Sequence, residues 1–131
     1  MEKVTLIVPV YNVEKYLKRC LDSLLNQTYN NIEILCVNDC SPDNSQEILD
    51  EYKKAGKINV IVNDVNLGLG KSRERALNKS TGNFVMFIDS DDYIAEDYVQ
   101  RYMDVMKYGD YDIVIGGYTR DIDGKKKKHC V

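Results

Sequence analysis

Short apolar runs that alternate with amphipathic helical patterns are the feature that most limits how this chain can fold. The runs are mostly apolar and rich in β-branched residues, and they cover residues 4–8, 32–37, 58–62, 84–88 and 112–115. Because such runs suit strands that are buried on both faces, they predict a parallel sheet with helices on either side. We therefore predict an α/β fold, a three-layer Rossmann-like domain with a mostly parallel sheet.

Helical patterns fill the intervals between these runs. In the first, predicted over residues 14–26, apolar side chains recur at the spacing of one helix face: Leu17, Cys20, Leu21, Leu24 and Leu25. Asn44 and Glu47 have the spacing of a capping box, so a second helix starts there and ends before Gly56. Two further helices are predicted over residues 71–79 and 96–107.

Length and charge narrow the class of protein. The chain has 131 residues, which suits one domain, and its net charge of −3 makes nucleic acid an unexpected partner. No stretch of about 18 residues is free of charge, and the N-terminus does not match a signal peptide. We therefore expect a cytoplasmic protein. The four cysteines lack zinc-site spacing, so we expect reduced thiols, with Cys20 and Cys36 buried.

Polar residues follow three of the predicted strands at the point where each strand ends. Tyr11 and Asn12 follow the first strand, Asp39 follows the second, and an acidic cluster at residues 89–92 follows the fourth. In parallel α/β sheets, ligands bind outside the carboxyl ends of the strands. These three positions therefore predict one common site.

The acidic cluster has two interpretations. Asp89, Asp91 and Asp92 lie within four residues, and their mutual repulsion is relieved when a divalent cation binds between them. Mg²⁺ and Mn²⁺ prefer oxygen ligands and commonly bridge carboxylates to substrate phosphates. The alternative is that these acids cap the following helix, a role that suits Asp92 better than Asp89 and Asp91 together. We favour the metal site.

Four motifs in order resemble family 2 glycosyltransferases of the GT-A fold. The resemblance covers residues 4–118, and its motifs are residues 8–12 with Asp39 and 41–43, residues 66–68 with Arg73, residues 81–82, and residues 87–92. It implies a domain that binds a nucleoside diphosphate sugar, with a UDP-sugar favoured, together with Mn²⁺ or Mg²⁺. The family often has Asn after the arginine of the second motif, where this chain has Glu74.

The resemblance also implies a role for individual residues. Asp39 accepts a hydrogen bond from the base, Asp91 ligates the metal, and Asp89 contacts the ribose or the metal. The implied nucleotide-sugar site comprises Pro9, Val10, Tyr11, Glu14, Asp39, Arg73, Asp89 and Ser90. The implied reaction transfers the sugar to an acceptor hydroxyl with inversion, and it suits surface polysaccharide or glycan synthesis.

The general base of the family has no counterpart in this chain. Family enzymes use a carboxylate beyond the acidic motif, whereas Asp121 and Asp123 fit a solvated loop. We therefore expect residues 1–131 to form a nucleotide-sugar-binding domain that ends before the acceptor-binding half, with the base outside the chain. The acceptor is expected to be a glycan or a lipid-linked molecule. The lysines at 125–128 fit a solvated loop or tail, and contact with the inner face of an anionic membrane is the alternative.

Two other functions compete with sugar transfer. Phosphohydrolases of the haloacid dehalogenase type also carry an Asp-x-Asp after an apolar strand, but usually on the first strand, and with Thr or Val where this chain has Tyr93. A non-catalytic nucleotide-binding module is the second alternative, because the chain lacks a recognisable base.

Overall fold

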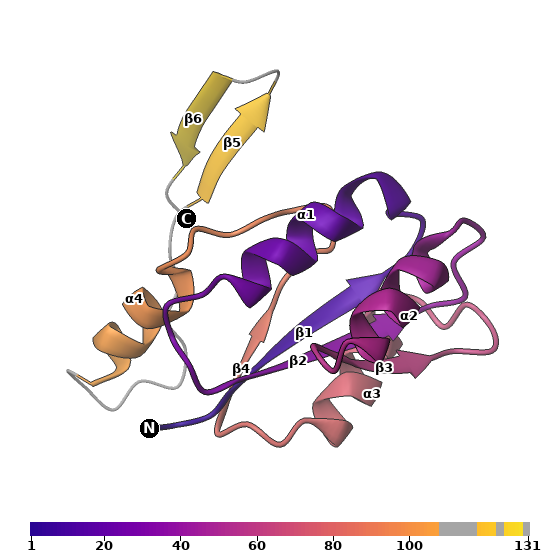
Figure 1. The fold of residues 1–131 in the computed structure, drawn as a ribbon, viewed down its shortest axis with the longest axis horizontal. Coiled ribbons are helices and arrows are strands. Elements are labelled where there is room, and N and C mark those ends of the chain that lie inside the picture. Colours follow the sequence, from indigo (N-terminus) through magenta and orange to yellow (C-terminus); the bar gives the residue numbers. More distant parts are fainter. Residues whose placement is uncertain (108–117, 123–124, 130–131) are drawn as a thin grey trace. The chain divides into compact units, whose positions relative to one another are not determined.

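A computed structural model describes residues 1–107, 118–122 and 125–129 of the chain. The chain divides into two compact units, Met1–Val99 and Gln100–Val131, and each is described by itself. In the first unit, four parallel strands form one sheet in the order β3-β2-β1-β4 (Figure 1). The strands are β1 (Val4–Val10), β2 (Ile32–Asn38), β3 (Asn59–Val62) and β4 (Phe84–Phe87). The predicted α/β class and parallel sheet are confirmed.

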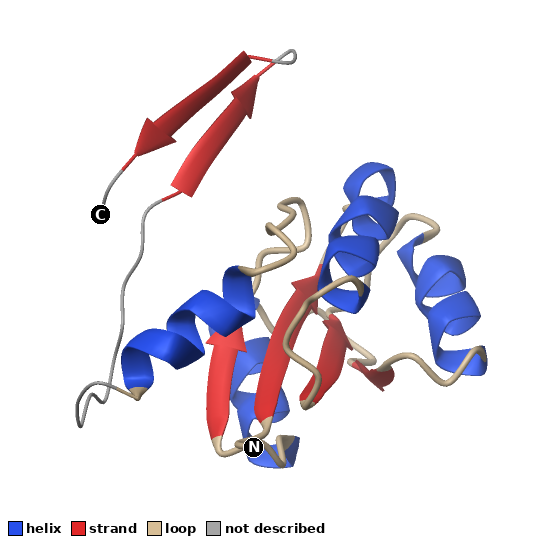
Figure 2. Ribbon diagram, turned by 60° about the vertical axis from the view of Figure 1, so that its left-hand side comes forward, coloured by secondary structure: helices blue, strands red, loops and turns tan. Residues whose placement is uncertain are grey.

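Helices cover both faces of this sheet. The helices α1 (Glu14–Leu25) and α2 (Ser45–Lys54) connect strands that step outward in one direction, from β1 to β2 to β3. The helix α3 (Leu69–Lys79) leads back across the sheet from β3 to β4. Because such crossovers are right-handed, α3 lies on the face opposite α1 and α2, as Figures 1 and 2 show.

The core follows the predicted periodicities. Helix α1 buries Leu17, Cys20, Leu21 and Leu24, four of the five residues that its sequence pattern indicated. On the face covered by α3, alternate strand residues pack with one helix residue into an apolar cluster: Ile7, Leu35, Val37, Ile61 and Ala76. Cys20 and Cys36 are buried free thiols, as expected.

Helix α3 begins two residues before its predicted start. Gly68 precedes it with a φ of 89°, a left-handed conformation that costs glycine little. The chain therefore turns sharply out of the loop that follows β3 and enters the helix at Leu69. This turn brings the start of α3 close to the carboxyl end of β2, because the main-chain nitrogens of Leu67 and Gly68 both donate to Asp39.

The second unit contains an antiparallel hairpin that the sequence analysis missed. Its strands are β5 (Tyr118–Ile122) and β6 (Lys125–His129), with Tyr118 opposite His129. The expected loop or tail at the lysines is therefore wrong, because a run of lysines has low strand propensity and gives no alternating pattern. The helix α4 (Tyr98–Met106) agrees with the prediction over residues 96–107. The strand predicted over residues 112–115 lies outside the described residues.

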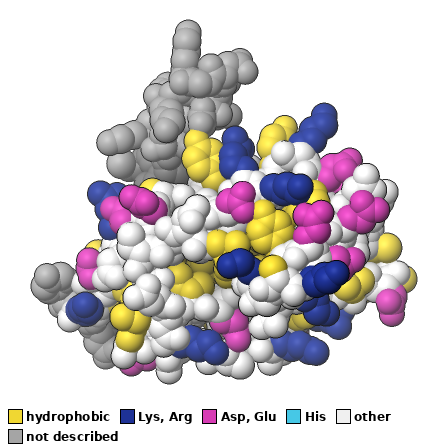
Figure 3. Space-filling view, viewed as in Figure 1, with side chains coloured by type: hydrophobic (Ala, Val, Ile, Leu, Met, Phe, Trp, Pro, Cys, Tyr) yellow, Lys and Arg dark blue, Asp and Glu magenta, His cyan; other side chains and the backbone are white. Residues whose placement is uncertain are grey.

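The distribution of charged side chains on the surface and the hydropathy of the helices agree with the composition of the chain. On the face drawn in Figure 3, lysine and arginine side chains are scattered among acidic ones and form no continuous basic patch. Within the part of the chain that the structure describes, no helix is long and apolar enough to cross a bilayer.

Candidate functional site

Main-chain hydrogen bonds bring the strand ends together at the carboxyl edge of the sheet. The Asp39 nitrogen donates to the Val10 oxygen at 2.9 Å, and the Asn63 nitrogen donates to the Asn38 oxygen at 2.8 Å. On the other side of β1, the Ile88 nitrogen donates to the Ile7 oxygen at 2.9 Å. The residues that follow β1, β2, β3 and β4 therefore start from one edge, which the sequence predicted for β1, β2 and β4.

Asp39 anchors the loop that follows β3. Its Oδ1 accepts hydrogen bonds from the Leu67 nitrogen at 2.7 Å and from Asn63 Nδ2 at 3.0 Å, and its Oδ2 accepts one from the Gly68 nitrogen at 2.9 Å. The residue is 5% exposed. Burial raises the pKa of Asp39, but the hydrogen bonds from Leu67, Asn63 and Gly68 outweigh it, so the pKa lies below its ordinary value. Asp39 is thus an ionised carboxylate at the edge of the site.

The segment after β1 presents one open side chain. Pro9 and Val10 are buried within β1, and the Val10 carbonyl accepts from the Asp39 nitrogen. Tyr11 is 50% exposed and Glu14 is exposed at the first position of α1. Of the implied nucleotide contacts in this segment, Tyr11 and Glu14 can offer a side chain, whereas Pro9 and Val10 form the wall behind them.

The acidic residues converge after β4. Asp89, Asp91 and Asp92 are exposed, and one carboxylate oxygen from each lies within 4.8 Å of the others. The Asp92 nitrogen donates to the Asp89 oxygen at 3.0 Å, which closes a tight turn, and Ser90 inside this turn is 5% exposed. Ser90 therefore offers little side-chain surface to a ligand, whereas the three carboxylates face solvent together.

The helix-cap interpretation of these acids is wrong. Helix α4 begins at Tyr98, six residues beyond Asp92, so none of the three carboxylates lies at its first turn. Burial, followed by the charges of Asp91 and Asp89, raises the pKa of Asp92 above its ordinary value. The turn therefore concentrates negative charge without a helix terminus to stabilise it.

Arg73 links this acidic turn to α3. Its Nη2 lies 3.5 Å from Asp89 Oδ1, and its guanidinium carbon lies 5.5 Å from the centre of the Phe87 ring. The ion pair is partly exposed, so its Coulombic contribution is small. The charge of Arg19 also acts on Asp92, but two guanidiniums do not balance three carboxylates, and the remaining charge suits a divalent cation with oxygen ligands. The residue types and their spacing fit Mn²⁺ or Mg²⁺.

A family model for glycosyl transferase family 2 matches residues 5–129. The chain belongs to this family. It is 48% identical over 118 residues to the glycosyltransferase GlyA of Streptococcus pneumoniae, covering 89% of this chain and 17% of GlyA. It is 41% identical over 118 residues to a poly(ribitol-phosphate) beta-glucosyltransferase of Bacillus spizizenii, covering 87% of this chain and 19% of that protein.

A solved relative shares the fold. The crystal structure of Staphylococcus aureus TarS 1–349 in complex with UDP superposes with a TM-score of 0.83 at 32% identity, covering 94% of this chain and 37% of that one. The same TarS fragment was also solved with UDP-GlcNAc. The predicted family and GT-A fold are confirmed, and the haloacid dehalogenase alternative is wrong. The chain spans well under half the length of these three proteins.

Two residues near the family 2 site were missed by sequence reasoning. Asn63 directly follows β3, so the rule that placed Asp39 at a strand end would also have indicated it. Arg19 lies on α1, and its guanidinium carbon is 4.5 Å from the centre of the Tyr93 ring in the segment just after the acidic turn. No local pattern distinguishes Arg19 from other charged residues of an exposed helix face.

Proposed function

We propose that this chain forms the donor-binding part of a glycosyltransferase that uses a nucleoside diphosphate sugar, with UDP as the nucleotide. The observation that carries the proposal is the convergence of Asp89, Asp91 and Asp92 at the same sheet edge as the ionised Asp39. Membership of family 2 and the complexes of TarS with UDP and UDP-GlcNAc support this choice of donor.

The proposal places Mn²⁺ or Mg²⁺ at the acidic turn. Asp91 and Asp89 are the assigned ligands, and Asp92 is near enough to share the cation, since the three carboxylates approach within 4.8 Å. When bound, the cation neutralises charge on the diphosphate and so stabilises it as a leaving group. Asp89 also pairs with Arg73, so this carboxylate connects the proposed metal site to α3.

The nucleoside would bind between the ends of β1 and β2. Tyr11 offers an exposed aromatic side chain, and Asp39 offers a carboxylate that accepts from Asn63 and from the Leu67 and Gly68 nitrogens, with Ser72 as a further partner. We propose that Oδ2, which accepts from the Gly68 nitrogen, also accepts from an N–H of the base. We assign Arg73 to the nucleotide side of the acidic turn, because its guanidinium already lies beside Asp89.

The acceptor, the general base and the cellular location stay predictions. We propose that the attacking hydroxyl belongs to a glycan or a lipid-linked acceptor of surface polysaccharide synthesis, which the poly(ribitol-phosphate) glucosyltransferase relative supports. We place the base outside residues 1–131, and we expect the reaction to occur in the cytoplasm. The described residues offer no counterpart of the family's base in a recognisable motif.

Thermal unfolding with and without Mn²⁺ tests the donor site. UDP at about 100 times its Kd should stabilise the chain by about 2.7 kcal/mol, which is a rise in Tm of roughly 6–12 °C, only when Mn²⁺ is present. GDP at the same concentration is the matched control and should raise Tm less. Equal stabilisation by both nucleotides would contradict the choice of UDP, and no stabilisation by either would contradict the donor site.

Release of UDP from UDP-GlcNAc separates an enzyme from a non-catalytic module. In the presence of Mn²⁺, a glycosyltransferase site should transfer the sugar slowly to water, or faster to an added acceptor hydroxyl. UDP is the leaving group in either case. Because the proposed base lies outside residues 1–131, the decisive readout for this chain is Mn²⁺-dependent hydrolysis of the donor; a chain that binds UDP tightly but hydrolyses no UDP-sugar acts on its own as a binding module.

A further inference from the structure

Asn63 is a buried amide at the carboxyl edge of the sheet that no motif indicated. It directly follows β3 and is 2% exposed. Its Nδ2 donates to Asp39 Oδ1 at 3.0 Å and to Ser72 Oγ at 3.0 Å, while its Oδ1 accepts from Arg75 Nη1. All the polar atoms of this side chain therefore have partners inside the protein.

The partners of Asn63 allow only one orientation of its amide. Arg75 can only donate, so it must face the amide oxygen, and the ionised Asp39 can only accept, so it must face the amide nitrogen. A side chain with both ends fixed in this way holds its neighbour in a defined position. Here the neighbour is the carboxylate that we assign to the nucleotide base.

The other partners of Asp39 are main-chain groups of a loop and the Ser72 side chain of α3. The Leu67 and Gly68 nitrogens hold the carboxylate from the side of α3, and Asn66 Nδ2 reaches the Asp39 carbonyl oxygen at 3.4 Å. Without Asn63, the Leu67 and Gly68 nitrogens would still hold one carboxylate oxygen each, but Oδ1 would lose its donor from the β3 side. The Asn63 amide therefore contributes to the orientation of the carboxylate, and with it to the direction in which Oδ2 can accept from the base.

The same network reaches the acidic turn through α3. Gly68 and Leu67 lead directly into α3, and Ser72 and Arg75 both come from this helix. Arg73, between them, contacts Asp89 on the acidic turn. Asn63 thus ties β3 to the helix that carries the only described ion pair of the acidic turn.

We propose that Asn63 is a positioning residue for donor recognition: its amide orients the Asp39 carboxylate toward the nucleotide base. The inference rests on the proposed function above, because it assigns the Asp39 carboxylate to the base. Asn63 itself lies behind Asp39 and does not contact the nucleotide. Its loss should weaken binding of the base while binding of the diphosphate and Mn²⁺ at the acidic turn is retained.

Calorimetric titration with two probes tests this inference. UDP and inorganic pyrophosphate, each with Mn²⁺, are titrated into the chain and into Asn63→Ala. The variant should bind UDP about tenfold or more weakly and bind pyrophosphate within about twofold of the unchanged chain. The ratio of the two affinities is the decisive quantity, because a purely structural defect that loosens the whole site lowers both together.

A matched buried amide supplies the control. Asn38 ends β2, is also buried, and uses its amide for Gln46 and the Ser41 nitrogen rather than for the Asp39 carboxylate. Asn38→Ala should lower Tm as Asn63→Ala does, but leave the ratio of UDP to pyrophosphate affinity unchanged. A changed ratio in Asn38→Ala as well would overturn the specific role of Asn63.

A second variant tests the inference even if Asn63→Ala folds poorly. Asn63→Asp has nearly the same shape and keeps an acceptor for Arg75, but it cannot donate to Asp39. It should reduce the ratio of affinities at least as much as Asn63→Ala. An unchanged ratio in both variants overturns the inference while leaving the donor site intact, whereas no UDP binding by the unchanged chain overturns both.

Discussion

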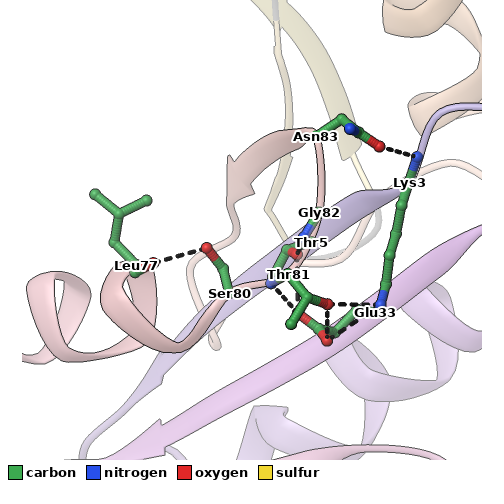
Figure 4. Close-up of polar contacts among 8 residues, drawn as sticks. All are labelled: Lys3, Thr5, Glu33, Leu77, Ser80, Thr81, Gly82 and Asn83. Carbon is green, nitrogen blue, oxygen red and sulfur yellow. Dashed lines mark hydrogen bonds and ion pairs between the residues drawn. The ribbon is translucent and has the colours of Figure 1, made fainter.

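The two ends of strand β2 each hold a hydrogen-bonded carboxylate, but their surroundings differ. At the amino end, Glu33 accepts from Thr5 Oγ1 at 2.9 Å, the Thr81 nitrogen at 3.0 Å and Thr81 Oγ1 at 2.7 Å (Figure 4). Lys3 Nζ lies 3.5 Å from Glu33 and balances its charge. At the carboxyl end, Asp39 is held by neutral donors, and the acidic turn after β4 begins from the same edge.

This difference separates stabilising chemistry from chemistry that needs a ligand. Around Glu33, the carboxylate contacts are internal and Lys3 pairs with the carboxylate, so the cluster fastens β1, β2 and the start of β4 together. A cavity of about 250 Å³ lies at this edge, lined in part by Lys3, Glu33 and Lys57, but it is remote from the acidic turn in the sheet. At the carboxyl edge, three exposed carboxylates share one described ion pair, with Arg73. This unbalanced charge is the reason that we propose the ligand site at the carboxyl edge.

Removing one carboxylate from the acidic turn should give the largest effect. Asp91→Ala takes away an assigned metal ligand. Loss of a residue that merely supports a ligand costs up to about 100-fold in metal affinity, so loss of the ligand should cost at least that much, equivalent to roughly 2.7 kcal/mol. The Mn²⁺-dependent rise in Tm with UDP should therefore disappear. Thermal unfolding with UDP and a series of Mn²⁺ concentrations measures this change.

The same variant distinguishes ligand binding from stability. Without metal, Asp91→Ala should be as stable as the unchanged chain or slightly more stable, because one of three repelling charges is gone. Asp104→Ala is a matched control on the exposed surface of α4, where Asp104 Oδ1 lies 3.8 Å from Lys107 Nζ, and it should keep the response to Mn²⁺. If Asp91→Ala retains the full response, the assigned ligand is wrong.

Adding a methyl group to Gly82, at the amino edge of the sheet, should give the next largest effect, a loss of stability. A Cβ on Gly82 would lie 2.5 Å from Thr5 Oγ1 and 2.7 Å from the Thr5 nitrogen. Because the main chain of β1 cannot move aside without disturbing the sheet, Gly82→Ala should lower the free energy of unfolding by about 2 kcal/mol. Urea unfolding measures the loss.

Gly70 provides the matched glycine at the other edge. It lies in the first turn of α3, and a Cβ there would meet nothing within 4 Å. Gly70→Ala should therefore raise the free energy of unfolding, by up to about 1 kcal/mol, through helix propensity. A loss of stability in Gly70→Ala similar to that in Gly82→Ala would contradict the view that the contacts with Thr5 cause the loss at Gly82.

The contrast between the edges also explains what the sequence could predict. The apolar runs and the helix pattern of Leu17 and Cys20 reflect burial, which leaves a regular period, so the sheet and α1 were predictable. Asp39 and the acidic turn were predictable because they follow strands directly. The Glu33 cluster joins Lys3 to Thr81 across 78 residues, and no local period marks such a pairing. The β5–β6 hairpin was missed because its lysines resemble a solvated segment.

Removing the charge of Glu33 should cost less than the added methyl group. Glu33→Gln weakens three hydrogen bonds to a carboxylate whose side chain is 13% exposed, and the expected loss is about 1.5 kcal/mol at neutral pH. Burial raises the pKa of Glu33, but the hydrogen bonds from Thr81 and Thr5 and the charge of Lys3 outweigh it, so the pKa lies below its ordinary value of 4.5.

That pKa fixes the sign of the pH dependence. Because the folded pKa is lowered, the stabilisation by Glu33 is complete above the unfolded value of 4.5 and is lost as pH falls through the folded value. The difference in the free energy of unfolding between the unchanged chain and Glu33→Gln should therefore be constant from pH 6 to 7. It should shrink as the pH falls toward about 3. Urea unfolding at several pH values checks this, and a difference that grows on acidification would contradict it.

The smallest effect is expected when Glu33, at the amino edge, loses its counterion Lys3. Lys3→Met removes the ion pair with Glu33 and a hydrogen bond from Lys3 Nζ to Thr81 Oγ1 at 2.6 Å, but Glu33 keeps its contacts with Thr5 and Thr81. The lysine side chain is about one-third exposed, so the loss should be about 0.5 kcal/mol and should decrease in high salt. Lys18→Met is the control, since Lys18 pairs with Glu51 at 3.9 Å, both side chains are more than half exposed, and the substitution should change stability less. The hydrogen bonds from Thr5 and Thr81 persist in Lys3→Met and are weakened in Glu33→Gln. If Lys3→Met loses as much stability as Glu33→Gln, the ion pair rather than these hydrogen bonds holds the amino edge together.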